Sequence, residues 1–113
     1  MLNITVKQAD IKDLDLILSS ESVDKIVTDP PWGLYENIEM GIEEFYKLAI
    51  LKMNKVLKYN GTIVLLLSRQ INIEAVLNEF HVLRLLHNYS VLVSGRKANL
   101  VKLKKLNIGT NSV

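Results

Sequence analysis

The sequence contains no cysteine among its 113 residues, so it can form neither a disulfide framework nor a thiolate metal site. We expect no metal site of another kind, because the two histidines, His81 and His87, stand without a cluster of companion ligands. Long apolar runs are also lacking, since a run such as Ile63 to Leu67 is far too short to span a bilayer. No basic segment followed by an apolar one opens the chain. We therefore expect a cytoplasmic protein with no membrane contact.

Acidic side chains are missing from the last third of the sequence. Residues 80–113 carry 6 Lys or Arg and no Asp or Glu, whereas residues 1–79 carry 8 Lys or Arg and 12 Asp or Glu. A basic end of this kind favours contact with phosphate. Lysines on an edge strand, which hinder aggregation, produce the same charge pattern. Charge alone leaves both interpretations open.

Apolar residues make up 49% of the chain, which is enough for the packed core of one domain. Strand patterns alternate with helical ones along the sequence. The predicted strands cover residues 3–8, 25–28, 62–67, 82–93 and 99–103, and the predicted helices cover residues 13–19, 41–58 and 71–79. We expect Asn60-Gly61 to stop the long helix. The order predicts an α/β fold whose mostly parallel sheet ends in an antiparallel strand pair.

The segment Asp29-Pro30-Pro31-Trp32-Gly33 follows a short apolar strand, at the end where open parallel sheets bind ligands. These residue types suit chemistry on an exocyclic amine of a nucleic-acid base. The Asp29 carboxylate and the Pro30 carbonyl can each accept one amine hydrogen, and two prolines stiffen the backbone that holds both acceptors. Trp32 offers a flat face for base stacking, and Gly33 permits a tight turn. The competing interpretation is a rigid turn with a packed tryptophan.

This segment resembles the Asp/Asn-Pro-Pro-aromatic signature of S-adenosylmethionine-dependent methyltransferases that act on base amines. The stretch Val6 to Ile11 is similar to the family's strand in which an acidic residue meets the cofactor adenine. Residues 23–28, 56–64 and 89–105 resemble the strand before the signature, the next helix-to-strand junction and the closing strand pair. The most similar members are THUMP-associated enzymes that methylate the guanine N2 amine of RNA. The resemblance implies the carboxy-terminal half of a Rossmann-like class I methyltransferase.

The resemblance also assigns roles to residues. It implies that Asp29, Pro30 and Trp32 are catalytic, and that Pro31, Trp32 and Gly33 contact the substrate. Asp10, Ile11 and Asp29 would bind S-adenosylmethionine. We expect the tyrosines at positions 35 and 46 to belong to the core or its rim rather than to the catalytic set. The pair Ser68-Arg69 at a strand end is a candidate substrate contact, although we favour an ordinary polar pair in a loop.

Glycine is scarce, and this scarcity limits the resemblance. The five glycines include no Gly-x-Gly, so the family's glycine-rich cofactor loop and the first two strands of its fold are absent. We therefore interpret residues 1–113 as a single partial methyltransferase domain. It would methylate a base amine, with RNA guanine as the expected target, only with a partner that supplies the cofactor loop. That partner would be a complementary half-domain chain or a second copy in a homodimer, with the strand at residues 3–8 as the exposed edge.

Two alternatives stay open at this point. DNA adenine or cytosine amine methyltransferases also place an acidic strand before an Asp-Pro-Pro signature, although the closing strand pair here favours the RNA enzymes. A non-catalytic remnant that binds a partner chain or nucleic acid would belong to a different functional class.

Overall fold

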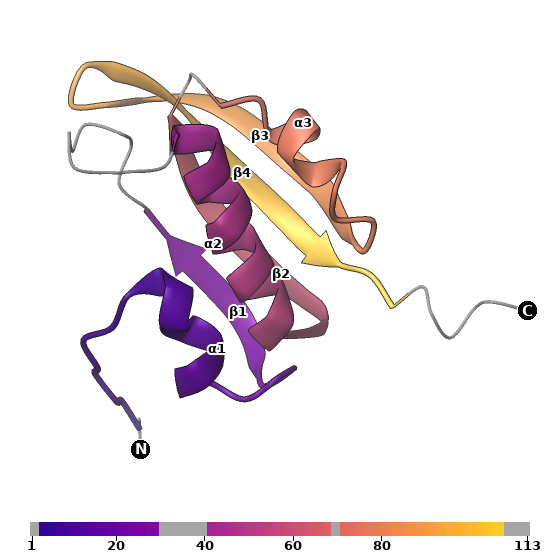
Figure 1. The fold of residues 1–113 in the computed structure, drawn as a ribbon. Coiled ribbons are helices and arrows are strands. Elements are labelled where there is room, and N and C mark those ends of the chain that lie inside the picture. The colour runs from indigo at the N-terminus through magenta and orange to yellow at the C-terminus, as the bar shows by residue number, and fades with distance from the viewer. Residues whose placement is uncertain (1–2, 30–40, 69–70, 108–113) are drawn as a thin grey trace, which may run out of the picture.

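The computed structural model describes residues 3–29, 41–68 and 71–107. A short 3-10 helix, η1 (Ile11–Asp13), leads into α1 (Leu14–Ile17). The remaining elements, in chain order, are β1 (Val23–Thr28), α2 (Ile42–Val56), β2 (Leu57–Ser68), α3 (Ile73–Leu77), β3 (Leu83–Val93) and β4 (Arg96–Lys105). The four strands form one sheet in the order β1-β2-β4-β3 (Figure 1). The last strand of the chain is therefore inserted between β2 and β3.

The described sheet is mixed, and its closing antiparallel pair, β3 with β4, matches the prediction. β1 pairs with β2 in parallel, and β4 pairs with both β2 and β3 in antiparallel orientation. A parallel pair needs a crossover connection, and α2 provides it between β1 and β2. Within the described ranges, no helix combines the length and apolar character needed to cross a membrane.

The predicted strand at residues 3–8 is wrong. These residues have no regular secondary structure, and Ile4 and Val6 are 78% and 89% exposed. Their alternating pattern is not enough, because a strand also needs a neighbouring backbone for its amide groups and a cover for its apolar face. The parallel part of the described sheet is consequently the β1–β2 pair, and among the described residues the edge strand on that side is β1 rather than residues 3–8.

Helix α2 matches the prediction closely and forms the centre of the core. Its buried positions recur at three- and four-residue spacing: Tyr46, Ala49, Ile50, Met53 and Val56. The first four of these pack in one cluster with Ile63, Leu65, Leu67, Val101 and Leu103, which lie on one face of β2 and β4. All of the helices lie on this same side of the sheet (Figure 1). The core is therefore a single layer of helices on a single sheet.

The junction between α2 and β2 differs from the prediction. The helix ends at Val56 because Leu57 is already extended, so Asn60-Gly61 does not stop it. Residues 57–61 instead form an irregular start to β2, with the register jumping from Val23↔Leu57 to Lys25↔Thr62. Asn60 adopts a positive φ of 68°. A Cβ at Gly61 would lie 2.8 Å from the Asp24 and Lys58 carbonyl oxygens, so glycine is required for close backbone approach.

The opposite face of the sheet carries an apolar stripe with no helix over it among the described residues. The strand registers place Val27 beside Val64, and Leu66 beside Leu100 and then Tyr89. Val27 is 79% exposed and Tyr89 is 55% exposed. We call this stripe the open face. A face of this composition is normally covered in α/β folds.

Candidate active site at the carboxyl end of β1

Asp29 follows directly after β1. The parallel neighbour β2 ends on the same side of the sheet, so the carboxyl ends of both strands lie there. The Asp29 side chain is exposed, whereas Ser68, the last residue of β2, is only 9% exposed. Carboxyl ends of adjacent parallel strands are the usual place for ligand binding in such sheets. Pro30, Pro31, Trp32 and Gly33 continue from this point and lie outside the described residues.

A buried hydroxyl lies beneath these strand ends. Tyr46, in the first half of α2, is fully buried, and its Oη has no hydrogen-bond partner among the described residues. Burial raises the pKa of the Tyr46 hydroxyl above 10.0, and the Asp29 carboxylate raises the pKa further. The Ser68 backbone opposes this and lowers the pKa, although its geometry falls short of a hydrogen bond. Tyr46 therefore stands close to both strand ends and stays neutral at ordinary pH.

The core position expected for Tyr46 is thus confirmed, while its contact with the site was not foreseen from the sequence. The sequence indicated only that Tyr46 belongs to the core or its rim. The adjacency of Tyr46 to Asp29 and Ser68 depends on how α2 is placed across β1 and β2. Tertiary placement of this kind leaves no local signal in the residues themselves.

Asp10 and Ile11, the residues expected to meet the cofactor adenine, lie before α1. Asp10 caps η1, with its Oδ1 accepting a hydrogen bond from the Lys12 backbone amide at 3.1 Å. Both residues line a groove of about 530 Å³ that also includes Leu14, Ile17 and Leu18. Ile11 and Leu14 are half-buried against the core. A carboxylate acceptor beside an apolar wall fits the amine and the ring of an adenine.

Ion pairs connect α1, which lines this groove, to the core helix α2. The Asp15 carboxylate lies 3.1 Å from Lys52 Nζ and 3.6 Å from Lys55 Nζ, so it joins α1 to α2. The hydrogen bond from Lys52 lowers the pKa of Asp15 below 3.8, and burial raises the pKa in part. The position of the Asp10 groove therefore depends on an ion-pair connection between helices.

Comparison with known families shows where this arrangement occurs. The model of the protein family described as "RMKL-like, methyltransferase domain" matches residues 1–99, which is most of the chain. The chain belongs to this methyltransferase-domain family. The membership confirms the resemblance drawn from the Asp29 segment, and with it the Rossmann-like α/β fold.

Individual relatives of the family support the same assignment. A protein of Methanothermococcus thermolithotrophicus described as "Probable tRNA (guanine(10)-N2)-dimethyltransferase" is 38% identical over 72 residues. That match covers 64% of this chain and 42% of the relative. The crystal structure of TrmN from Thermus thermophilus is 26% identical, with a TM-score of 0.69 over 88% of this chain and 28% of that one. The chain thus spans less than half the length of these two relatives.

Two more distant structures share the fold alone. An rRNA methylase from Streptococcus thermophilus is 19% identical and has a TM-score of 0.56 over 88% of this chain and 55% of its own. A DNA modification methylase from Thermus thermophilus is 13% identical, with a TM-score of 0.60 over 87% of this chain and 52% of its own. The fold of this methyltransferase-domain family therefore extends across enzymes named for RNA and for DNA.

Proposed function

We propose that this chain carries the substrate-amine site of an S-adenosylmethionine-dependent methyltransferase that acts on the N2 amine of guanine in RNA. The observation that carries the proposal is the position of Asp29. It stands at the carboxyl end of β1, beside the end of β2, and it opens the Asp-Pro-Pro-Trp signature. The relative described as "Probable tRNA (guanine(10)-N2)-dimethyltransferase" supports the choice of RNA guanine.

Asp29 would act on the amine through its charge. An exocyclic amine is a weak nucleophile, because its lone pair is drawn into the base ring. The Asp29 carboxylate accepts one amine hydrogen, and the Pro30 carbonyl is expected to accept the other. Two fixed acceptors favour the pyramidal nitrogen and stabilise the positive charge that develops on it. Trp32 and Gly33, with Pro31, are proposed to hold the base plane.

Tyr46 would contribute as a neutral neighbour of this carboxylate. Because its pKa is raised, the hydroxyl adds no second negative charge beside Asp29 at ordinary pH. The Asp29 carboxylate therefore meets no like charge from Tyr46. The buried Tyr46 ring also supports the strand end that carries Asp29, since α2 packs tightly on β2.

S-adenosylmethionine would supply the methyl group, which is activated by its sulfonium. Within this chain, Asp10 and Ile11 are proposed to hold the adenine, the former through its carboxylate and the latter through apolar contact. The sequence has no Gly-x-Gly loop to approach the methionine end. Cofactor binding is therefore proposed to require residues that these 113 do not include.

The open face and the free edge of β1 support this need for a complementary part. Val27, Val64, Leu66 and Leu100 form an apolar surface, and β1 has no second strand beside it among the described residues. Backbone groups on a bare strand edge tend to pair with another strand. We propose that the remaining part of the methyltransferase domain covers both features, on the same or a separate polypeptide. A homodimer through the same edge is the alternative outcome.

Product analysis tests the proposed function. The chain, carrying an affinity tag, is purified from its native cells together with whatever binds it. The preparation is then supplied with isotopically labelled S-adenosylmethionine and either total tRNA or DNA. The proposal expects label in N2-methylguanosine after digestion of the tRNA to nucleosides. Label confined to DNA, or to methylated adenine or cytosine, would contradict it.

A further inference from the structure

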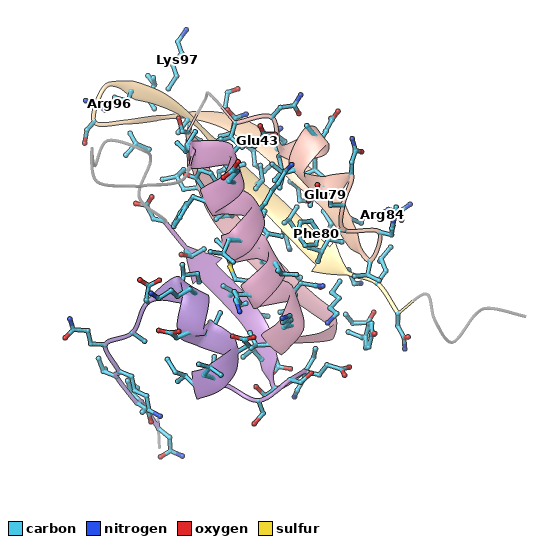
Figure 2. The ribbon with its side chains drawn as sticks, in the orientation of Figure 1. Glu43, Glu79, Phe80, Arg84, Arg96 and Lys97 are labelled. Atoms are coloured by element: carbon cyan, nitrogen blue, oxygen red, sulfur yellow. The ribbon has the colours of Figure 1, made fainter. Side chains whose placement is uncertain are left out.

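The β3–β4 hairpin reaches past the end of β2, next to the proposed site. Ser68, the last residue of β2, pairs with Ala98, and Ala98 pairs in turn with Val91. Residues 92–97 therefore extend beyond β2. They lie on the side of the sheet where β1 ends before Asp29. We call residues 90–99 the hairpin tip. Figure 2 shows Arg96 and Lys97 at this tip, and Arg84 at the opposite end of the hairpin.

The backbone of the hairpin tip forms a tight turn. Ser94 and Gly95 both have positive φ, at 49° and 80°, as a two-residue hairpin turn of the primed kind requires. The two strands are also linked by side chains, because the Asn99 side-chain amide donates a hydrogen bond to Asn88 Oδ1 at 2.7 Å.

The side chains of the hairpin tip combine positive charge with apolar surface. Arg96 and Lys97 are exposed, and Leu92 is 71% exposed although it is a large apolar residue. A groove of about 610 Å³ at the tip is lined by Ser90, Val91, Leu92, Lys97, Ala98 and Asn99, and Arg96 follows the turn next to it. Cations beside an apolar and polar groove match the phosphate, the face and the edges of a nucleotide.

The cations of the tip differ from the lysines of α2 and of the start of β2. Four lysines lie within 4 Å of a carboxylate: Lys47 with Glu79, Lys52 and Lys55 with Asp15, and Lys58 with Asp24. The hairpin offers no acidic partner, because the sequence contains no Asp or Glu after Glu79. The charge of Arg96 and Lys97 is therefore not neutralised within their own hairpin and is directed outward.

We infer that the hairpin tip binds single-stranded RNA, with Arg96 and Lys97 on the phosphate backbone and Leu92 against an unpaired base. The inference rests on the proposed function and adds to it a surface that presents the substrate strand to Asp29. We choose an unpaired strand because a base that is stacked within a duplex cannot place its face against an apolar side chain such as Leu92. Modification of a base amine likewise needs a base that has left its helix.

Binding of a fluorescently labelled single-stranded RNA oligonucleotide to the intact chain tests the inference by anisotropy. The double variant Arg96→Glu/Lys97→Glu should bind about tenfold more weakly or worse, because it removes two phosphate contacts. The slope of log affinity against log salt should fall by about 0.7 for each lost contact on a single strand. Leu92→Ala should weaken binding about fivefold with no change in the salt slope.

A matched control lies at the other end of the same hairpin. Arg84 pairs with Lys104 across the strands, so Arg84→Glu/Lys104→Glu makes the same change in charge far from the tip. This control should weaken binding by less than about twofold beyond the general effect of net charge at moderate salt. Circular dichroism confirms that each variant is folded before binding is compared.

Three results would overturn the inference: equal loss in the control and tip variants, unchanged binding in the tip variant, or binding to anionic lipid vesicles in place of RNA. The result is separable from the proposed function, because the assay reads no methyl transfer. Tip-dependent RNA binding without N2-methylguanosine would refute the function alone. Methylation with a tip that does not matter for RNA binding would refute the inference alone.

Discussion

Tyr46 shows how one residue can be structural and still belong to the site. Its ring fills the core beneath β1 and β2, while its hydroxyl stays without a partner among the described residues, close to Asp29. A buried hydroxyl without a hydrogen bond destabilises the fold by about 1–3 kcal/mol. Residues that destabilise the fold in this way are often found at functional sites.

Replacing Tyr46 by phenylalanine should therefore raise the stability of the isolated chain. We expect Tyr46→Phe to increase the free energy of unfolding by about 1–3 kcal/mol, measured by urea denaturation. Tyr59→Phe is the control, because Tyr59 is 42% exposed. A Tyr46→Phe variant less stable than the parent would mean that the hydroxyl has a partner.

The same variant should change the alkaline stability of the chain. Because the folded-state pKa of Tyr46 is raised above 10.0, the unfolded chain loses this proton first as pH increases. Stability linked to Tyr46 is fully present below pH 10 and falls as pH rises through the folded pKa. Tyr46→Phe should lose less stability than the parent over this range of pH. An identical alkaline profile for both proteins would argue against a raised pKa.

At the scale of elements, a buried lysine connects the end of α2 to the sheet. Lys105, the last residue of β4, is 5% exposed, and its Nζ donates hydrogen bonds to the Asn54 and Leu57 carbonyl oxygens at 2.7 and 2.9 Å. Its Nζ also lies 4.7 Å from the centre of the Tyr59 ring. A cation at this position satisfies carbonyls that a helix end leaves unpaired.

Loss of this lysine should destabilise the fold. We expect Lys105→Met to lower the free energy of unfolding by about 1.5–3 kcal/mol, because two buried carbonyls lose a charged donor. Lys104→Met, one residue earlier and half-buried on the other side of β4, should cost less than about 0.5 kcal/mol. Thermal melting of both variants gives the comparison. Equal melting temperatures would show that the carbonyls find another donor.

Elements with a strong local pattern were predicted well from the sequence. Helix α2 and the hairpin of β3 and β4 carry helical periodicity or a tight-turn sequence that decides their structure over short distances. Residues 3–8 and Asn60-Gly61 were predicted wrongly because their structure depends on neighbours elsewhere in the chain. Asp29 was placed correctly at a strand end. Its proximity to Tyr46 could not be predicted, because it depends on how α2 lies across the sheet. Its position relative to the hairpin tip depends on the sheet order β1-β2-β4-β3.

For the molecule as a whole, the open face and the edge of β1 predict association. We expect the isolated chain to dimerise or to bind a complementary part, as measured by sedimentation velocity. Val27→Lys should reduce this association, since Val27 is 79% exposed on the edge strand. Leu16→Lys is the control, because Leu16 is 82% exposed on α1, on the helix side of the sheet. A stable monomer at high concentration would contradict the expectation.

Cofactor affinity should follow from the same incompleteness. The isolated chain should bind S-adenosylmethionine weakly, because one hydrogen bond from Asp10 contributes only about 0.5–1.5 kcal/mol net. Titration calorimetry on the chain alone, and on the assembly purified from cells, measures the difference. A dissociation constant in the low micromolar range for the chain alone would mean that the groove at Asp10 and Ile11 suffices.

The central claim is that Asp29 acts on the amine rather than supporting a turn. Single-turnover methyl transfer by the complete assembly, measured with melting temperature on the same samples, tests this claim. Asp29→Ala should slow transfer by about 100- to 1000-fold while leaving the melting temperature nearly unchanged, because Asp29 is exposed at a strand end. Trp32→Ala should weaken RNA binding more than it slows the bound step. If both variants lose stability while the assembly keeps its rate, the segment is structural and the account is wrong.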